Sequence, residues 1–229
     1  MCDDLAKEIL LKRLENEVGV DGIHFIDSGN YHYVSALFTR LIKTPFSLVV
    51  LDHHPDMQAP MFDILSCGGW VLDVLNNNPF VMDVHIIGAD DHLISMLPKA
   101  DVHRVNFYSI RDIFGADVSS DAQEEAQAPA EHSSAQMYRL PQTHYPVYLS
   151  VDKDVISRDE LVTNWDQGEA TSEQVISLVR ALAPKTIGID ICGECAPDQE
   201  DCNLTEAIRG NDDFNLRLLN AIEEQRENS

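Results

Sequence analysis

The chain has 229 residues, 44% of them hydrophobic, which is enough to bury the core of one large α/β domain. Its formal net charge of −23 should repel phosphate backbones and anionic lipid surfaces, so we expect neither nucleic acid nor a membrane as partner. The five cysteines show no framework spacing and no secretory signal, which predicts reduced thiols in a cytoplasmic protein.

Strand-like apolar runs alternate with helix-like periodic segments along the chain. Residues 1–19 carry acids early and lack a continuous apolar stretch, which predicts an amphipathic helix rather than a signal peptide. The elements predicted after it, in chain order, are strand 23–27, helix 31–43, strand 46–51, helix 70–75, strand 84–88, helix 92–97, strand 103–108, strand 146–151, helix 172–182, strand 186–191 and helix 214–225.

Two local features refine this prediction. Thr171 and Gln174 are spaced like a capping box at the start of the helix that follows. The segment near 116–136 is small, polar and acidic, which predicts a flexible insert rather than a domain boundary. We therefore expect residues 1–229 to form a single α/β domain.

Strands separated by helices predict a mostly parallel sheet with helices on both faces. The runs at 46–51 and 146–151 are apolar at consecutive positions, as in strands that are buried on both faces. In such sheets, ligands bind beyond the carboxyl ends of the strands. Functional residues are therefore expected directly after these runs.

Ligand-type side chains do follow both of these strands. Asp52, His54 and Asp56 come after the first, and Asp152 and Asp154 come at the end of the second. Alternate residues of an extended chain point the same way, so each set should converge at the end of its strand. One D-x-H-x-D segment alone is a common loop sequence. Two such sets at equivalent strand ends predict a metal centre.

His32 adds an imidazole at the start of the helix after strand 23–27. Four carboxylates in one pocket would repel each other, at roughly 4 kcal/mol for a pair about 4 Å apart in an effective dielectric of ~20. Two divalent cations would cancel these four charges. A carboxylate-rich ligand set suits Mn²⁺, whereas Zn²⁺ or Fe²⁺ fits less well. Two such ions can share a water and make it a hydroxide nucleophile at neutral pH.

Three segments resemble the signature motifs of the arginase/agmatinase (ureohydrolase) family, in the same order and with similar spacing. LDHHPD at 51–56 resembles D-A-H-x-D, SVDKD at 150–154 resembles S-x-D-x-D, and SGNYHYVS at 28–35 resembles G-G-D-H-S. The resemblance covers approximately residues 23–200. It implies a three-layer α/β/α sandwich with a central, mostly parallel sheet and two Mn²⁺ ions per chain.

The resemblance also implies a division of the ligands and an activity. The first ion would be bound by His32, Asp52, Asp56 and Asp152, and the second by Asp52, His54, Asp152 and Asp154. A hydroxide bridging the two ions would attack the carbon of a guanidinium or amidine in a small-molecule substrate and break a linear C–N bond. Family members commonly form trimers or hexamers, which implies a homo-oligomer.

Glu194 is the candidate for binding the substrate. The segment ECAP at 194–197 resembles the family's E-x-x-P, whose glutamate binds the guanidinium, and a carboxylate matches that planar fork of donors. Asp154 and Glu194 are therefore the predicted catalytic residues. The segment TNWDQGEAT stands where the family has G-G-L-T, and we expect Trp165 and Asp166 to line the substrate pocket.

The loops depart from the family pattern in ways that keep the metal chemistry and leave the substrate open. The family has a catalytic histidine about a dozen residues after its metal motif, whereas residues 61–70, MFDILSCGGW, contain none. Another group would then have to protonate the leaving amine, and His53, His85 and His92 are the candidates.

Two alternatives stay open beside the ureohydrolase-like reaction. A zinc-dependent deacetylase or amide hydrolase of the same broad fold would use one ion, and the second metal set that His32 and Asp56 complete counts against it. A catalytically inactive metal- or ligand-binding relative is favoured by the missing loop histidine. Cys192 and Cys195 are expected to pack near the strand end, because the chain has no partner Cys-x-x-Cys for a thiol zinc site.

Overall fold

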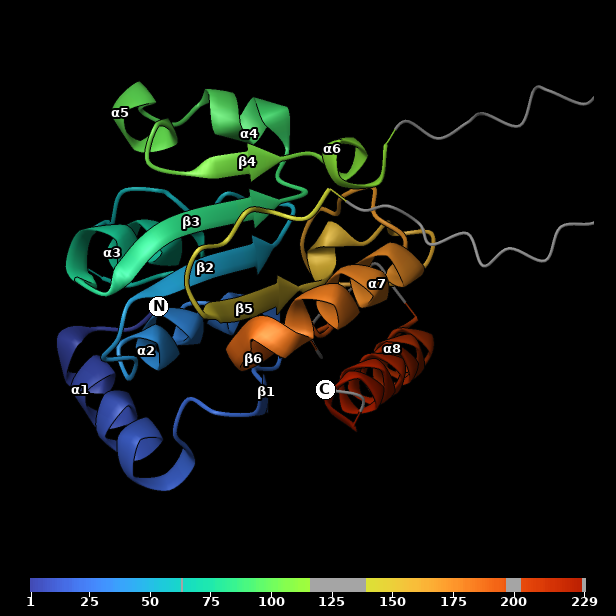
Figure 1. The fold of residues 1–229 in the computed structure, drawn as a ribbon, viewed down its shortest axis with the longest axis horizontal. Coiled ribbons are helices and arrows are strands. Elements are labelled where there is room, and N and C mark those ends of the chain that lie inside the picture. Colours follow the sequence, from blue (N-terminus) through green and yellow to red (C-terminus); the bar gives the residue numbers. More distant parts are fainter. Residues whose placement is uncertain (63, 116–138, 197–202, 228–229) are drawn as a thin grey trace, which may run out of the picture.

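The central sheet fixes where the ligand-type residues meet. The computed structural model describes residues 1–62, 64–115, 139–196 and 203–227, so the predicted insert near 116–136 lies outside the described residues. Every pairing between the described strands is parallel (Figure 1). Across the sheet, the strands are β1 (Ile23–Phe25), β6 (Thr186–Cys192), β5 (Val147–Asp152), β2 (Phe46–Leu51), β3 (Val81–Ile87) and β4 (Asn106–Tyr108). The predicted mostly parallel sheet is thus confirmed.

Helices and helical turns connect these strands. The α-helices are α1 (Asp4–Arg13), α2 (Val34–Thr39), α3 (Trp70–Asn77), α4 (Asp91–Ser95), α5 (Lys99–Val102), α6 (Ile110–Phe114), α7 (Ser172–Leu182) and α8 (Leu204–Glu227). A π-helical turn, η1 (Leu14–Val18), extends α1, and 3₁₀ turns are η2 (Gly29–Tyr31), η3 (Cys67–Gly69), η4 (Lys153–Val155) and η5 (Ala183–Lys185).

The sheet is the middle of three layers, because its side chains alternate between two cores. On β2, Leu48 and Val50 pack with residues of α2 and α3, whereas Val49 and Leu51 pack with residues of α7 and α8. In Figure 1, α2 and α3 lie along one face of the sheet, and α7 and α8 cover the other. β2 and β5 are buried at every position, which explains why their sequences are continuously apolar.

Most predicted elements are found with shifted ends. β2 matches its prediction, and the capping box of α7 forms as expected, with Thr171 and Gln174 exchanging backbone and side-chain hydrogen bonds. The helix predicted over 31–43 is shorter, because a 3₁₀ turn forms first and α2 begins only at Val34. The last helix begins at Leu204 rather than at 214.

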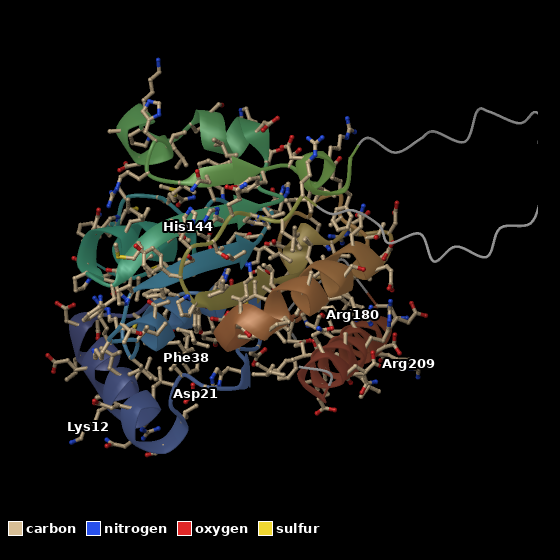
Figure 2. All side chains as sticks on the ribbon, viewed as in Figure 1. Lys12, Asp21, Phe38, His144, Arg180 and Arg209 are labelled. Atoms are coloured by element: carbon tan, nitrogen blue, oxygen red, sulfur yellow. The ribbon has the colours of Figure 1, made fainter. Side chains whose placement is uncertain are left out.

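The helices that flank the sheet carry charged side chains on their outer sides. Figure 2 shows Lys12 on α1, Arg180 on α7 and Arg209 on α8, all on helices that flank the sheet. Among the described helices, none combines the length and the apolar character that a membrane span requires.

Candidate metal centre

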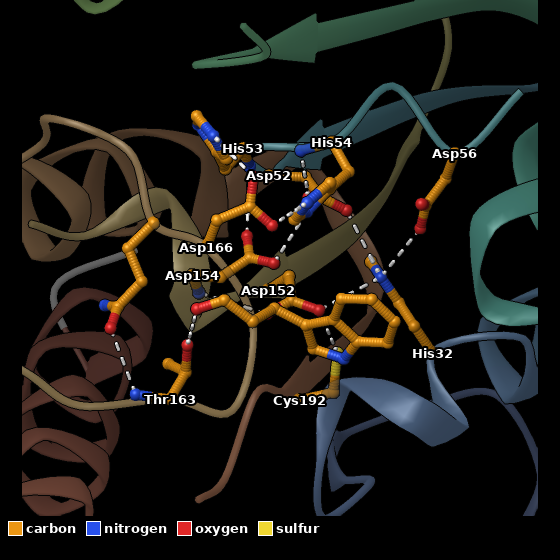
Figure 3. Close-up of polar contacts among 12 residues, drawn as sticks. His32, Asp52, His53, His54, Asp56, Asp152, Asp154, Thr163, Asp166 and Cys192 are labelled. Atoms are coloured by element: carbon orange, nitrogen blue, oxygen red, sulfur yellow. Dashed lines mark hydrogen bonds and ion pairs between the residues drawn. The ribbon is translucent and has the colours of Figure 1, made fainter. Parts of the chain in front are cut away.

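The carboxyl ends of β1, β2 and β5 bring the six predicted metal ligands into one cluster (Figure 3). The turn after β1 carries His32, the segment after β2 carries Asp52, His54 and Asp56, and β5 and its following 3₁₀ turn carry Asp152 and Asp154. The cluster lies where parallel sheets of this kind bind ligands. Its members come from two parts of the sequence, residues 32–56 and 152–154, that lie about a hundred residues apart.

His32 is the centre of the first group. Its side chain is 1% exposed, and three carboxylate oxygens lie 3.2–3.3 Å from its Nδ1. These oxygens belong to Asp52, Asp56 and Asp152. Nδ1 and Asp52 Oδ2 are nevertheless buried without a hydrogen-bond partner. One imidazole nitrogen cannot serve three carboxylates, so this point of the structure fits a cation.

A chain of buried hydrogen bonds holds the His32 ring from behind. The Ser150 hydroxyl donates to Asp190 Oδ1 at 2.7 Å, so it accepts the bond from His32 Nε2 at 2.8 Å. The Tyr148 hydroxyl donates to the other Asp190 oxygen at 2.5 Å. His32 Nε2 therefore donates to Ser150, and Nδ1, which faces the carboxylates, is the ring nitrogen left to bind a cation. Histidine ligands of metals are typically fixed in this way by a partner on the other ring nitrogen.

His54 is the centre of the second group. Its Nδ1 lies 2.9 Å from Asp154 Oδ2 and 3.6 Å from Asp52 Oδ1. Its Nε2 lies 3.0 Å from Asp166 Oδ1, and the Asp166 carboxylate is largely exposed. Asp166 therefore accepts the Nε2 proton and leaves Nδ1 to face the cluster.

The backbone fixes the carboxylates locally. The amide of His54 donates to Asp52 Oδ1 at 2.6 Å, and the amide of His53 donates to Asp154 Oδ1 at 3.0 Å. Asp152 caps its 3₁₀ turn by accepting from the Asp154 amide at 3.0 Å. Each carboxylate thus keeps at least one oxygen directed at the centre.

Asp56, the last ligand-type residue after β2, has an unusual backbone conformation. It has φ 48°, a left-handed conformation that aspartate tolerates better than most residues. The Trp70 indole donates to Asp56 Oδ2 at 2.8 Å, and Trp70 is fully buried at the start of α3. The first residue of α3 therefore holds the Asp56 carboxylate in place.

Burial and charge distort the acidity of the cluster. Burial and the neighbouring Asp52 raise the pKa of Asp56 to about 7. Burial and Asp152 raise the pKa of Asp154 well above its usual range. Although burial opposes it, contact with Asp154 and Asp52 raises the pKa of His54 to about 12. All three pKa values are raised, as expected where closely packed acids need compensating positive charge, which two divalent ions would supply.

The predicted pocket residues Trp165 and Asp166 do lie at the cluster. The indole packs against Gly29 so closely that an added Cβ there would lie 2.9 Å from Trp165 Cδ1. The same indole stands edge-on to the His54 ring, with centroids 5.9 Å apart, and is 39% exposed. Gln167 fixes this loop by donating to the backbone oxygens of Ile156 and Leu161. Their role in substrate binding stays a prediction.

Glu194 has partners that the sequence did not suggest. Its Oε1 accepts hydrogen bonds from the fully buried Lys153 ammonium and, at 2.8 Å, from the Asn215 amide of α8. Lys153 lies between two ligand-type aspartates in the sequence but points away from them. Burial lowers the pKa of Lys153, and Glu194 opposes that shift. The guanidinium-binding role of Glu194 stays a prediction, and Pro197 of its motif lies outside the described residues.

The three candidate histidines are separated by the structure. His53 adjoins the cluster, with its ring centroid 5.1 Å from that of His54, and burial lowers its pKa. His85 lies within β3, where its ring nitrogens meet Asp83 and the Tyr108 hydroxyl. His92 is exposed on α4. Only His53 of these three is thereby placed beside a predicted ligand.

Three buried residues near the cluster were not predicted as functional from the sequence: Ser150, Asp190 and Cys192. Ser150 and Asp152 share parity on β5, and Asp190 and Cys192 share parity on β6. Parity within each strand was therefore the available signal. Their meeting across the two strands depends on the pairing of Ser150 with Asp190 and of Asp152 with Cys192.

Comparison with known proteins identifies relatives and a fold. No family model matches the chain. An uncharacterized protein from Thermotoga maritima is 30% identical over 202 residues, which cover 88% of this chain and 68% of that protein.

Solved structures of known enzymes share the architecture. The agmatine ureohydrolase of Thermoplasma volcanium has a TM-score of 0.63 at 18% identity, covering 98% of this chain and 68% of that one. The proclavaminate amidino hydrolase from Streptomyces clavuligerus has a TM-score of 0.63 at 19% identity, covering 96% and 71%. The arginase from Bacillus caldovelox has a TM-score of 0.59 at 13% identity, covering 95% and 74%. The chain therefore belongs to the same family as the Thermotoga maritima protein, and its fold is that of the arginases and ureohydrolases.

Proposed function

We propose that this chain is a cytoplasmic hydrolase that uses two Mn²⁺ ions to cleave a linear C–N bond in a small guanidino or amidine compound. The observation that carries the proposal is the position of His32 Nδ1, which faces three carboxylate oxygens at 3.2–3.3 Å and has no hydrogen-bond partner. The fold supports it, because solved structures of this fold include a ureohydrolase, an amidino hydrolase and an arginase.

The motifs suggest how the ligands would divide between the two ions. His32, Asp52, Asp56 and Asp152 would hold one ion, and Asp52, His54, Asp152 and Asp154 would hold the other. When bound, such ions lower the pKa of a shared water and so supply hydroxide near neutral pH. We assign Asp154 to orienting this water, because the His53 amide fixes its Oδ1 while its Oδ2 faces the cluster beside His54 Nδ1.

The leaving nitrogen needs a proton. Water adds its oxygen to the amidine carbon, the C–N bond breaks, and the departing amine is protonated. We assign this proton delivery to His53, whose ring lies beside that of His54. Its Nε2 lies 3.7 Å from Asp166 Oδ2, so the exposed carboxylate of Asp166 connects the imidazole to solvent.

The pairing of Glu194 favours a second candidate. Binding a guanidinium through Glu194 would require its carboxylate to leave Lys153 or to serve both cations, since its Oε1 already accepts from Lys153 and Asn215. A relative that binds metal and ligand without turnover would keep this pair intact. The two candidates share the metal centre and differ in turnover.

The test is metal content followed by turnover. The protein is reconstituted with Mn²⁺, its metal is counted by elemental mass spectrometry, and agmatine, arginine and other guanidino or amidine compounds are screened for urea or ammonia release. Asp154→Asn replaces one predicted ligand by an uncharged side chain of similar shape. Asp73→Asn is the matched control. Asp73 lies on α3 outside the cluster and forms an ion pair with Arg40.

We expect about two ions per chain in the wild type and in Asp73→Asn, with fewer ions and no turnover in Asp154→Asn. Absence of bound metal, or full turnover in Asp154→Asn, contradicts the proposal. Two ions without turnover of any compound in the screen would select the second candidate instead.

A further inference from the structure

Cys192 places a thiol at the metal centre. It is the last residue of β6, is fully buried, and pairs with Asp152 across the sheet. Its Sγ lies 3.0 Å from Asp152 Oδ2, the oxygen that also lies 3.3 Å from His32 Nδ1 (Figure 3). The thiol therefore lies beside the position predicted for the ion that His32 would bind.

The unpartnered nitrogen of His32 is a second, independent sign of a ligand at this point. Its Nδ1 is buried without a hydrogen bond, although three carboxylates surround it. Ligand atoms of His32, Asp152 and Cys192 all lie within 4.8 Å of one another. That spacing suits three donors bound to one ion at the usual distances of about 2.0–2.3 Å for nitrogen, oxygen and sulfur ligands.

We propose that Cys192 Sγ is a ligand of the ion held by His32 and Asp152, so that this position takes a thiophilic divalent ion such as Zn²⁺, Fe²⁺ or Co²⁺ in preference to Mn²⁺. The proposal rests on the metal centre of the proposed function. Binding forms a sulfur–metal bond, breaks the S–H bond and releases one proton to solvent, with no change of oxidation state. Soft sulfur ligands favour these ions, whereas carboxylate and water ligands suit Mn²⁺.

This assignment changes the expected behaviour of the two positions. The ion bound by His54 and Asp154 has only nitrogen and oxygen donors among the described residues and keeps its preference for Mn²⁺. The centre would then be mixed in its metal preference. The earlier expectation that Cys192 only packs at the strand end accounts for its burial but not for its contact with Asp152.

The experiment uses Co²⁺ as a spectroscopic probe in the full-length protein. A Co²⁺–thiolate bond gives an intense near-ultraviolet charge-transfer band, which oxygen and nitrogen ligands do not. We compare the wild type with Cys192→Ser and, as control, with Cys2→Ser. Cys2 is equally buried but pairs with the Leu65 backbone and lies outside the described ligand groups. Circular dichroism checks folding, and elemental mass spectrometry counts the cobalt.

We expect the band in the wild type and in Cys2→Ser, and its loss in Cys192→Ser with cobalt still bound. In competition, the preference for Zn²⁺ over Mn²⁺ should fall by about tenfold or more in Cys192→Ser. Cobalt bound to the wild type without the band, or a band that persists in Cys192→Ser, overturns the thiolate ligand and leaves the proposed function standing. A folded wild type that binds no cobalt and no Mn²⁺ overturns both. If Cys192→Ser does not fold, Cys192→Val is used with the same readout.

Discussion

Replacing Ser150 by alanine should test the hydrogen-bond chain behind His32 without disturbing the packing of the sheet. Ser150 lies on β5, is fully buried, and contributes one hydroxyl to this chain. Alanine keeps the strand and nearly the same volume. The change therefore removes the hydroxyl's hydrogen bonds to His32 and Asp190, and a longer one of 3.5 Å to Ser35, and little else.

The magnitude follows from the two partners. The hydroxyl is 2.8 Å from His32 Nε2 and 2.7 Å from Asp190 Oδ1. Both would be left buried without that partner, at about 1–3 kcal/mol for each group. We expect the metal-free protein to lose at least about 2 kcal/mol of its free energy of unfolding. Because the His32 proton is no longer held on Nε2, affinity for Mn²⁺ should fall about 10–100-fold.

Ser47 offers a matched control on the neighbouring strand. It is also fully buried, but its hydroxyl has no hydrogen-bond partner. Ser47→Ala should therefore leave the free energy of unfolding within about 0.5 kcal/mol of the wild type or raise it. Urea unfolding of the metal-free protein and calorimetric titration with Mn²⁺ measure both quantities. Equal losses in the two variants, or unchanged Mn²⁺ affinity in Ser150→Ala, would refute the role given to the Ser150 hydroxyl.

Two further predictions concern histidines and their partners. Asp166→Ala removes the acceptor at His54 Nε2 and should lower Mn²⁺ affinity about 10–100-fold, with little change in melting temperature because the Asp166 carboxylate is 69% exposed; unchanged affinity in titration calorimetry would contradict this. Burial lowers the pKa of His85 below 6.5, against the pull of Asp83 and with a further lowering from His144. The unfolded chain then binds more protons between the folded pKa and 6.5, so stability should fall as pH drops through that window and less steeply in His85→Gln; thermal unfolding between about pH 8 and pH 5 tests this, and identical slopes would contradict it.

The framework of the site could be predicted because it depends on short-range rules. β2 and β5 are continuously apolar, so their ends were visible in the sequence, and this placed Asp52, His54, Asp152 and Asp154 at one edge of the sheet. The expected alternation of an extended chain does not hold there, because Asp154 lies in a 3₁₀ turn and Asp56 has a left-handed backbone. The helix boundaries were less accurate. The predicted helix after β1 begins as a 3₁₀ turn, where Gly29 must lie close under the Trp165 ring. That close approach is a tertiary contact, which no local pattern contains.

The groups that were missed share a different origin. Whether Cys192 meets Asp152, and whether Asp190 meets Ser150, depends on the register of β6 against β5. A shift of one residue would turn Asp190 and Cys192 to the opposite face of the sheet. The register is set in turn by the apolar residues that alternate with them, Ile189 and Ile191, which belong to the core shared with α7 and α8. The packing of the far face of the sheet therefore determines which donors reach the metal centre. On this reasoning, the proposed thiol ligand and the hydrogen-bond chain to His32 are consequences of one strand register.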